Sequence, residues 1–262
     1  MKENDEEKYV RQTLEAHGFD VERVGEDGVE RRADYEFRKS ADHYILEVTA
    51  KKETQFVLDL LREAGRCGLA TSDRKIDYWN RADALVKDKV RQLVSTPGRA
   101  ESFRVLWLCA LHHDGVSVTD LVRRTVYGLC DLIGHTRERT FISRPCFYYD
   151  FNTFFSVPDW DGLVLENPKG CLLCINEFSP RVQHFRLCEL ARVFREECPQ
   201  SIYDPVALDK EGHALRIEGN VNRRDHHAKW KYLLDKYGLQ TCPSIESEFV
   251  GFAIVNGFTD SQ

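Results

Sequence analysis

Residues 33–51 read ADYEFRKSADHYILEVTAK, and their alternation of apolar and polar side chains predicts two successive β-strands, over 33–38 and 43–51. In the first strand one face carries Ala33, Tyr35 and Phe37, and the other carries Asp34, Glu36 and Arg38. In the second strand one face carries Tyr44, Leu46, Val48 and Ala50, and the other carries Ile45, Glu47, Thr49 and Lys51. Asp34 and Glu47 therefore fall on the more polar faces of neighbouring strands.

The sequence on either side predicts a layered α/β fold. Before this pair, we expect an amphipathic helix over 5–17 and a short strand over 19–24. After it, helical patterns cover 55–64 and 77–94, and the continuously apolar residues 103–111 predict a strand buried on both faces. Later segments predict helices over 118–133, 181–197 and 224–237, with strands over 140–149, 163–166 and 171–176. The expected class is α/β, with a mixed central sheet flanked by helices.

Bulk composition indicates a folded cytoplasmic protein. Of the 262 residues, 42% are hydrophobic and 11% aromatic, which is enough to build a core. The N-terminus is charged from its first residues, and no apolar run reaches the length that crosses a bilayer, so we expect neither a secretory signal nor a membrane partner. Nine scattered cysteines, several inside apolar stretches, are expected to be reduced core residues. The formal net charge of −6 does not indicate nucleic-acid binding, although a local basic surface is compatible with it.

The order helix, strand, strand with Asp34, strand with Glu47, helix and buried strand resembles the PD-(D/E)xK (restriction-endonuclease-like) nuclease superfamily over roughly the first 110 residues. Ala33 stands where the motif name has proline. The resemblance implies that Asp34 and Glu47 bind Mg²⁺ or Mn²⁺, and that a lysine two positions after the glutamate orients the attacking water. A hard cation of this kind prefers carboxylate oxygens, and Mg²⁺ usually takes only one or two of them from the protein.

The lysine is where this chain departs from the family pattern, because Thr49 occupies its position. Lys51 is the next residue on the same face, but its Cα is expected ~13 Å from that of Glu47, against ~6.6 Å for the usual spacing. A bulge at 49–50 would bring Lys51 closer. A substitute is also available from the helix over 77–94, where Lys89 and Gln92 fall one turn apart on one side.

The resemblance implies a nuclease-like core over residues 1–150, with a C-terminal α/β extension over 151–262 that has no assigned role or packs with the core as one domain. The expected function is metal-dependent cleavage of phosphodiester bonds in nucleic acid, DNA before RNA, as an endonuclease or exonuclease. The catalytic residues would be Asp34, Glu47 and Lys51, with Glu7 on the first helix as an additional carboxylate. Thr49 leaves open a catalytically inactive module that binds nucleic acid or a protein partner. A second copy of the chain is also left open as a partner.

Overall fold

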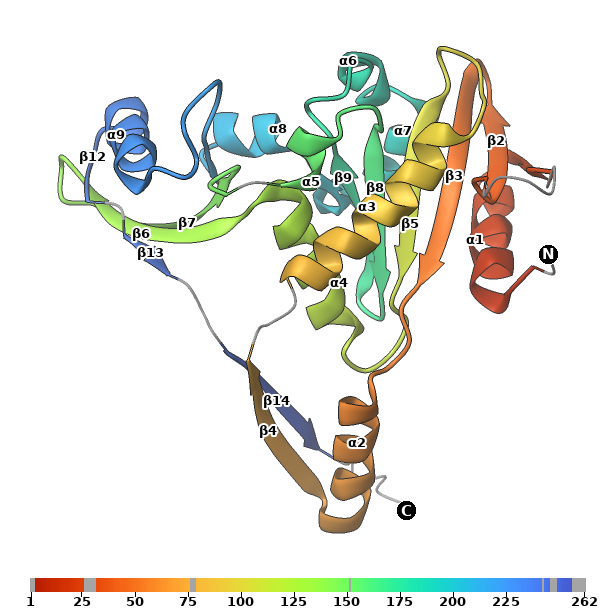
Figure 1. Cartoon of the computed structure of the whole chain (residues 1–262), viewed down its shortest axis with the longest axis horizontal. Coiled ribbons are helices and arrows are strands. Elements are labelled where there is room, and N and C mark those ends of the chain that lie inside the picture. Colours follow the sequence, from red (N-terminus) through yellow and green to blue (C-terminus); the bar gives the residue numbers. More distant parts are fainter. Residues whose placement is uncertain are drawn as a thin grey trace.

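The main body is a seven-stranded sheet with helices on both faces (Figure 1). It is seen in a computed structural model that describes residues 3–25, 32–75, 79–150, 152–241, 243–245 and 249–255. The predicted α/β class, with a mixed central sheet flanked by helices, is confirmed.

The strands of this sheet run in the order β1-β2-β3-β5-β8-β9-β10. They are β1 (Asp20–Arg23), β2 (Tyr35–Lys39), β3 (Asp42–Ala50), β5 (Phe103–Cys109), β8 (Gly162–Asn167), β9 (Gly170–Ile175) and β10 (Ile202–Tyr203). The first three form an antiparallel meander. β3, β5 and β8 are parallel to one another, β9 is antiparallel to β8, and β10 is parallel to β9. Because neighbouring parallel strands need a crossover, a helix must pass over the sheet between β3 and β5.

Two smaller sheets complete the strands. The second sheet contains β6 (Cys130–Thr136), β7 (Phe141–Phe147), β11 (Leu215–Arg216), β12 (Leu239–Thr241) and β13 (Ser244–Ile245). The third is the antiparallel pair of β4 (Leu69–Lys75) and β14 (Phe249–Val255). This pair and the helix α2 extend away from the main body, at the bottom of Figure 1.

The helices occupy both faces of the main sheet and the connections between sheets. They are α1 (Asp5–Ala16), α2 (Gln55–Cys67), α3 (Trp79–Ser95), α4 (Gly115–Tyr127), α5 (Thr153–Ser156), α6 (Val182–Phe185), α7 (Glu189–Glu197), α8 (Pro205–Lys210) and α9 (His226–Tyr237), with a 3₁₀ turn over Pro199–Ser201. α1 and α7 pack on one face of the main sheet. α3 and α4 pack on the other, and α3 supplies the required crossover.

The core explains why β3 and β5 are buried on both sides. Leu46 and Val105 belong to the apolar cluster that includes α1 and α7, whereas Ile45 and Leu106 belong to the cluster that includes α3 and α4. Each fully buried side chain of this kind contributes about 1.5–3 kcal/mol. The strand predicted over 103–111 is therefore confirmed as one covered by helices on both faces.

Two helix predictions were wrong in extent. The helix expected over 118–133 ends at Tyr127, because Gly128 adopts a φ of +56° and a Cβ there would come within 2.3 Å of the Asp150 carbonyl oxygen. The residues from Cys130 onward form β6 instead. The helix expected over 181–197 is two helices, α6 and α7, because Cys188 is extended and its sulfur caps the second one at the Ala191 N–H.

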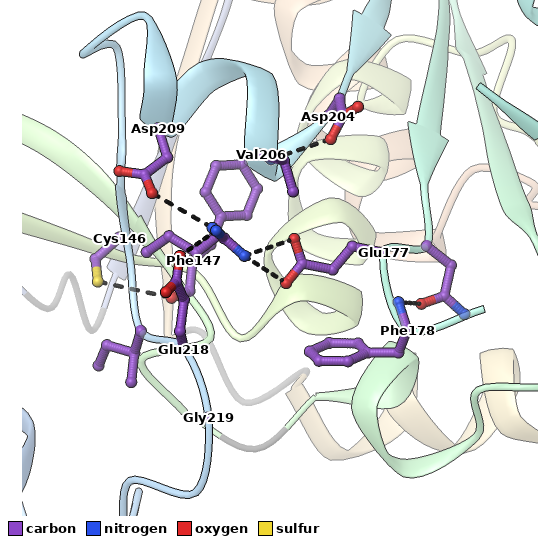
Figure 2. Close-up of polar contacts among 12 residues, drawn as sticks. Cys146, Phe147, Glu177, Phe178, Asp204, Val206, Asp209, Glu218 and Gly219 are labelled. Carbon is purple, nitrogen blue, oxygen red and sulfur yellow. Dashed lines mark hydrogen bonds and ion pairs between the residues drawn. The ribbon is translucent and has the colours of Figure 1, made fainter. Parts of the chain in front are cut away.

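Partly buried ion pairs connect the second sheet to α8 and to the residues that follow β9 (Figure 2). The Arg216 guanidinium on β11 lies 3.0 Å from Glu177 Oε1, just after β9, and 3.4 Å from Asp209 Oδ2 on α8. Because β8, β9 and β10 belong to the first sheet, residue 150 does not separate the two sheets. This continuity agrees with the alternative in which residues 151–262 pack with the core as one domain, and a division near 150 stays a prediction.

Two further expectations concern the environment of the chain. In the part of the chain that the structure describes, no helix has both the length and the apolar character needed to cross a membrane. Cys109, Cys174 and Cys188 are buried free thiols, as expected of reduced core cysteines.

Candidate active site

Glu47 lies in the middle of β3, on the sheet face that α3 covers. Its neighbour Leu106 on β5 is part of the apolar cluster beneath α3 and α4. The predicted alternation along β3 is confirmed, since Tyr44, Leu46 and Val48 all belong to the cluster on the opposite face. The Glu47 side chain is 0% exposed, so the face that carries it is not solvated.

Asp34 is brought beside Glu47 by the antiparallel pairing of β2 and β3. Tyr35 pairs with Leu46, so Asp34 comes opposite Glu47, just before β2 begins. The Asp34 N–H donates to the Leu46 carbonyl at 3.0 Å, and Oδ2 of Asp34 accepts from the Val48 N–H at 2.7 Å. The carboxylate thus accepts a hydrogen bond from an N–H of β3, in the place where a backbone carbonyl of the neighbouring strand would accept it. Among the described residues, Oδ1 of Asp34 has no hydrogen-bond partner.

The helix α3 supplies two donors to Glu47. Lys89 Nζ lies 2.7 Å from Oε1 of Glu47, and Gln92 Nε2 lies 2.9 Å from Oε2. The two donors are three residues apart, and the prediction that they share one side of this helix is confirmed. The Lys89 side chain is 25% exposed and Asp34 is partly buried, so the cluster is not sealed from solvent at these residues.

The two carboxylates are costly to ionise together. Burial raises the pKa of Glu47 to about 8, the charge of Asp34 adds to the increase, and the ammonium of Lys89 opposes it. Burial also raises the pKa of Asp34 to about 6, against the hydrogen bond from Val48. Lys89 provides one positive charge for two carboxylates, so the site favours an additional cation or a retained proton.

Glu7 lies close enough to influence the pair, but its carboxylate already has partners. Its charge raises the pKa of both Asp34 and Glu47. Glu7 closes a capping box at the start of α1, in which its oxygens accept from Asn4 Nδ2 at 2.7 Å and from the Asn4 N–H at 3.2 Å. It also pairs with Arg23 at 3.5 Å. This arrangement accounts for Glu7 as a helix cap, and a ligand role for it stays a prediction.

The structure does not bring Lys51 to the carboxylates. Thr49 is buried at the usual lysine position, and Lys51 is exposed beyond the end of β3, with its N–H bonded to the Cys109 carbonyl at 2.8 Å. The pairing of β3 with β5 continues without a shift through Thr49 and Ala50, so the bulge considered for this position is not there. Among the described residues, Lys89 is the lysine whose ammonium contacts Glu47.

Thr96 is a further member of the site that the sequence did not single out. Its hydroxyl accepts from the Ala33 N–H at 2.7 Å, one residue before Asp34. The available signal was its spacing, because Thr96 follows Gln92 by four residues and stands directly after the last residue of α3.

The donor set suits a hard divalent cation held by few protein ligands. Two carboxylates whose pKa values are raised by burial, and an Asp34 oxygen that has no hydrogen-bond partner among the described residues, provide negative charge and oxygen donors. Within the described ranges, no group of three or more His, Cys, Asp or Glu side chains is arranged to hold a metal ion. A metal ion at this site would therefore have two protein carboxylates as ligands and would take its other ligands from water or substrate.

Comparison of the chain with protein-family models, characterised proteins and solved structures found no match. The site is therefore interpreted from its own residues and geometry.

Proposed function

We propose that the chain is a metal-dependent nuclease that cleaves phosphodiester bonds of nucleic acid, with DNA favoured over RNA. The order α1, β1, β2, β3, α3 and β5 supports a restriction-endonuclease-like core, since it is the order that the sequence resemblance implies. In this chain α2 and β4 are inserted between β3 and α3. The strands β8 to β10 would then extend the sheet of that core.

A single observation carries the proposal: Asp34 and Glu47 meet across two strands, and an ammonium group lies 2.7 Å from Glu47. Asp34 and Glu47 would hold Mg²⁺ or Mn²⁺, which when bound would stabilise negative charge on the phosphoryl group and acidify a water molecule. The Asp34 carboxylate is oriented by the Val48 N–H, which leaves its other oxygen available to a ligand.

Lys89 takes the role that the family pattern gives to the lysine after the glutamate. Its position on α3 replaces the position that Thr49 fills on β3. A partly exposed ammonium next to the carboxylates can orient a water molecule, and it can offset the negative charge that develops on the phosphate oxygens. We therefore assign the lysine role to Lys89 in place of Lys51.

One observation favours a catalytically inactive module that binds nucleic acid or a protein partner. Both oxygens of Glu47 are hydrogen-bonded to α3, and the side chain is fully buried. In that alternative the Lys89–Glu47 ion pair is purely structural, and no substrate reaches the carboxylates.

A cleavage assay separates the two functions. Purified wild type and the variants Asp34→Asn, Glu47→Gln and Lys89→Met are incubated with plasmid or single-stranded DNA, with Mg²⁺ or Mn²⁺ or with a chelator. We expect metal-dependent cleavage that falls by on the order of 100-fold in each variant. Lys87→Met is the matched control, because Lys87 lies on the same helix and pairs with Asp83 at 2.7 Å. Cleavage that is equal in all variants would mean another site or a contaminant, and no cleavage by wild type would favour the inactive module.

A further inference from the structure

The peptide unit between Arg32 and Ala33, one unit before the one that carries the Asp34 N–H, is held at both of its polar atoms by Gln92 on α3 and by Thr96 directly after this helix. The Arg32 carbonyl oxygen accepts from Gln92 Nε2 at 2.5 Å, and the Ala33 N–H donates to Thr96 Oγ1 at 2.7 Å. A peptide unit is planar, so two contacts at its opposite sides fix its orientation. The φ and ψ angles of Ala33 and the torsions of Asp34 itself then join this unit to the carboxylate.

Contacts with β3 restrain these torsions. Asp34 donates its own N–H to the Leu46 carbonyl at 3.0 Å, and its Oδ2 accepts from the Val48 N–H at 2.7 Å. The segment 32–34 is therefore held between α3 and β3. The regular pairing of β2 with β3 ends at Tyr35. The hydrogen bonds from Gln92 and Thr96 therefore hold the backbone of residues 32 and 33, which strand pairing does not hold.

The same helix also fixes the second carboxylate. Gln92 Nε2 has two hydrogens, and it donates one to the Arg32 carbonyl and one to Oε2 of Glu47 at 2.9 Å. The Thr96 hydroxyl donates to the Gln92 carbonyl at 2.9 Å, which turns a lone pair toward the Ala33 N–H. Thr96 is 1% exposed, so a lost partner would not be replaced by water without rearrangement.

We propose that Thr96 and Gln92 form a clamp that sets the position of Asp34 relative to Glu47, and that Thr96 is a positioning residue of the site. This inference rests on the proposed nuclease function and names a residue on which that function depends. Thr96 touches neither carboxylate, and it acts through the peptide unit between Arg32 and Ala33.

The test compares two substitutions at Thr96 with a matched control. Thr96→Val keeps the shape and removes both hydrogen bonds of the hydroxyl, whereas Thr96→Ser keeps the hydroxyl. Thr125→Val is the control, because the Thr125 hydroxyl is also buried and also donates to the carbonyl four residues earlier, at 2.8 Å, although Thr125 lies within α4. Four quantities are measured: kcat and KM for DNA cleavage, Mn²⁺ affinity by titration, and the pKa of Asp34 by carboxyl NMR.

We expect Thr96→Val to lower kcat by on the order of 10- to 100-fold with little change in KM, because a small displacement of a catalytic group has effects of this size. Thr96→Ser should recover most of the loss, and Thr125→Val should leave kcat unchanged. The pKa of Asp34 should fall by about one unit toward its ordinary value in Thr96→Val, as the carboxylate relaxes toward solvent. If Thr96→Val does not fold, Gln92→Met carries the same expectation for Asp34.

The outcomes also separate the clamp from the nuclease function. If the wild type shows no cleavage that depends on Asp34, the nuclease proposal fails, and the pKa of Asp34 and the Mn²⁺ affinity still decide whether the clamp exists. A change in both quantities in Thr96→Val, but not in Thr125→Val, supports it. The clamp is overturned if Thr96→Val and Thr125→Val lose similar stability while kcat, Mn²⁺ affinity and the pKa of Asp34 all remain at their wild-type values.

Discussion

Replacing Glu47 by Gln should change how the stability of the protein depends on pH. The pKa of Glu47 is raised from 4.5 to about 8, mainly by burial and then by the charge of Asp34. The native state therefore keeps its proton up to about pH 8, whereas the unfolded chain loses it near its ordinary pKa. Between these two values the native state binds more protons, so the free energy of unfolding decreases as the pH rises.

The size of the effect follows from the difference between the two pKa values. That difference is about 3.5 pH units, and each unit corresponds to about 1.4 kcal/mol. The free energy of unfolding should therefore decrease by at most about 5 kcal/mol, and the full decrease is reached only above pH 8. By pH 7 about 3 kcal/mol would already be lost. Because Asp34 and Glu47 titrate as a pair, we expect a measured difference of at least about 2 kcal/mol between pH 5 and pH 8.5.

The assay is urea denaturation followed by circular dichroism, at several pH values and with a chelator present. Glu47→Gln cannot titrate, so its stability should fall less than that of the wild type over this range. Glu36→Gln is the control, since Glu36 is an exposed carboxylate on β2. Curves for wild type and Glu47→Gln that stay parallel within about 0.5 kcal/mol, the size of ordinary surface effects, would refute the reasoning.

Three other predictions concern the ion pairs and the metal. Lys89→Met should destabilise the protein by about 3 kcal/mol at pH 8.5, because it leaves a buried carboxylate without its ammonium, whereas Lys87→Met should cost only about 0.5 kcal/mol in the same urea experiment. Equal losses in these two variants would contradict this. Mn²⁺ affinity, measured by isothermal titration, should be at least about tenfold higher at pH 8 than at pH 6, because the carboxylate ligands must be deprotonated. Mn²⁺ binding should disappear in Asp34→Asn. Binding that is independent of pH would count against the site. Arg216→Met should cost about 3 kcal/mol at pH 8 and less at pH 5, because it leaves Glu177 buried with a raised pKa. Adding Glu177→Gln should recover at least half of that loss of stability in thermal or urea unfolding. If stability is not recovered, the loss does not come from the Glu177 carboxylate.

The parts of the site that follow from local periodicity could be predicted from the sequence. Alternation over residues 33–51 is enough to assign two strands and to place Asp34 and Glu47 on neighbouring ones. Helical spacing is enough to place Lys89 and Gln92 on one side of a helix. Both patterns depend only on repeat lengths of the backbone, so they need no knowledge of distant contacts.

The features of the fold that local sequence patterns do not predict depend on contacts between distant segments. Alternation along β3 does not indicate that α3 covers the face that carries Glu47 and leaves this residue fully buried. The strands β8 to β10 join the sheet from beyond residue 160, which no local pattern indicates. The end of α4 depends on the approach of the Asp150 carbonyl to Gly128, a contact between residues that periodicity does not relate.

The imbalance between two carboxylates and one ammonium group is itself an argument for function. Apolar residues of similar volume often stabilise a core as well as a buried ion pair does, or better. In this core two carboxylates share one ammonium, burial raises the pKa of both, and the charge of Asp34 raises that of Glu47 further, so the cluster lowers stability at neutral pH. Groups of perturbed pKa that reach solvent gather at functional sites more often than elsewhere. Replacing both Asp34 and Glu47 by apolar residues therefore separates the two roles. If their role is purely structural, the variant should be less stable than the wild type. If they form a catalytic site, the variant should be more stable and inactive.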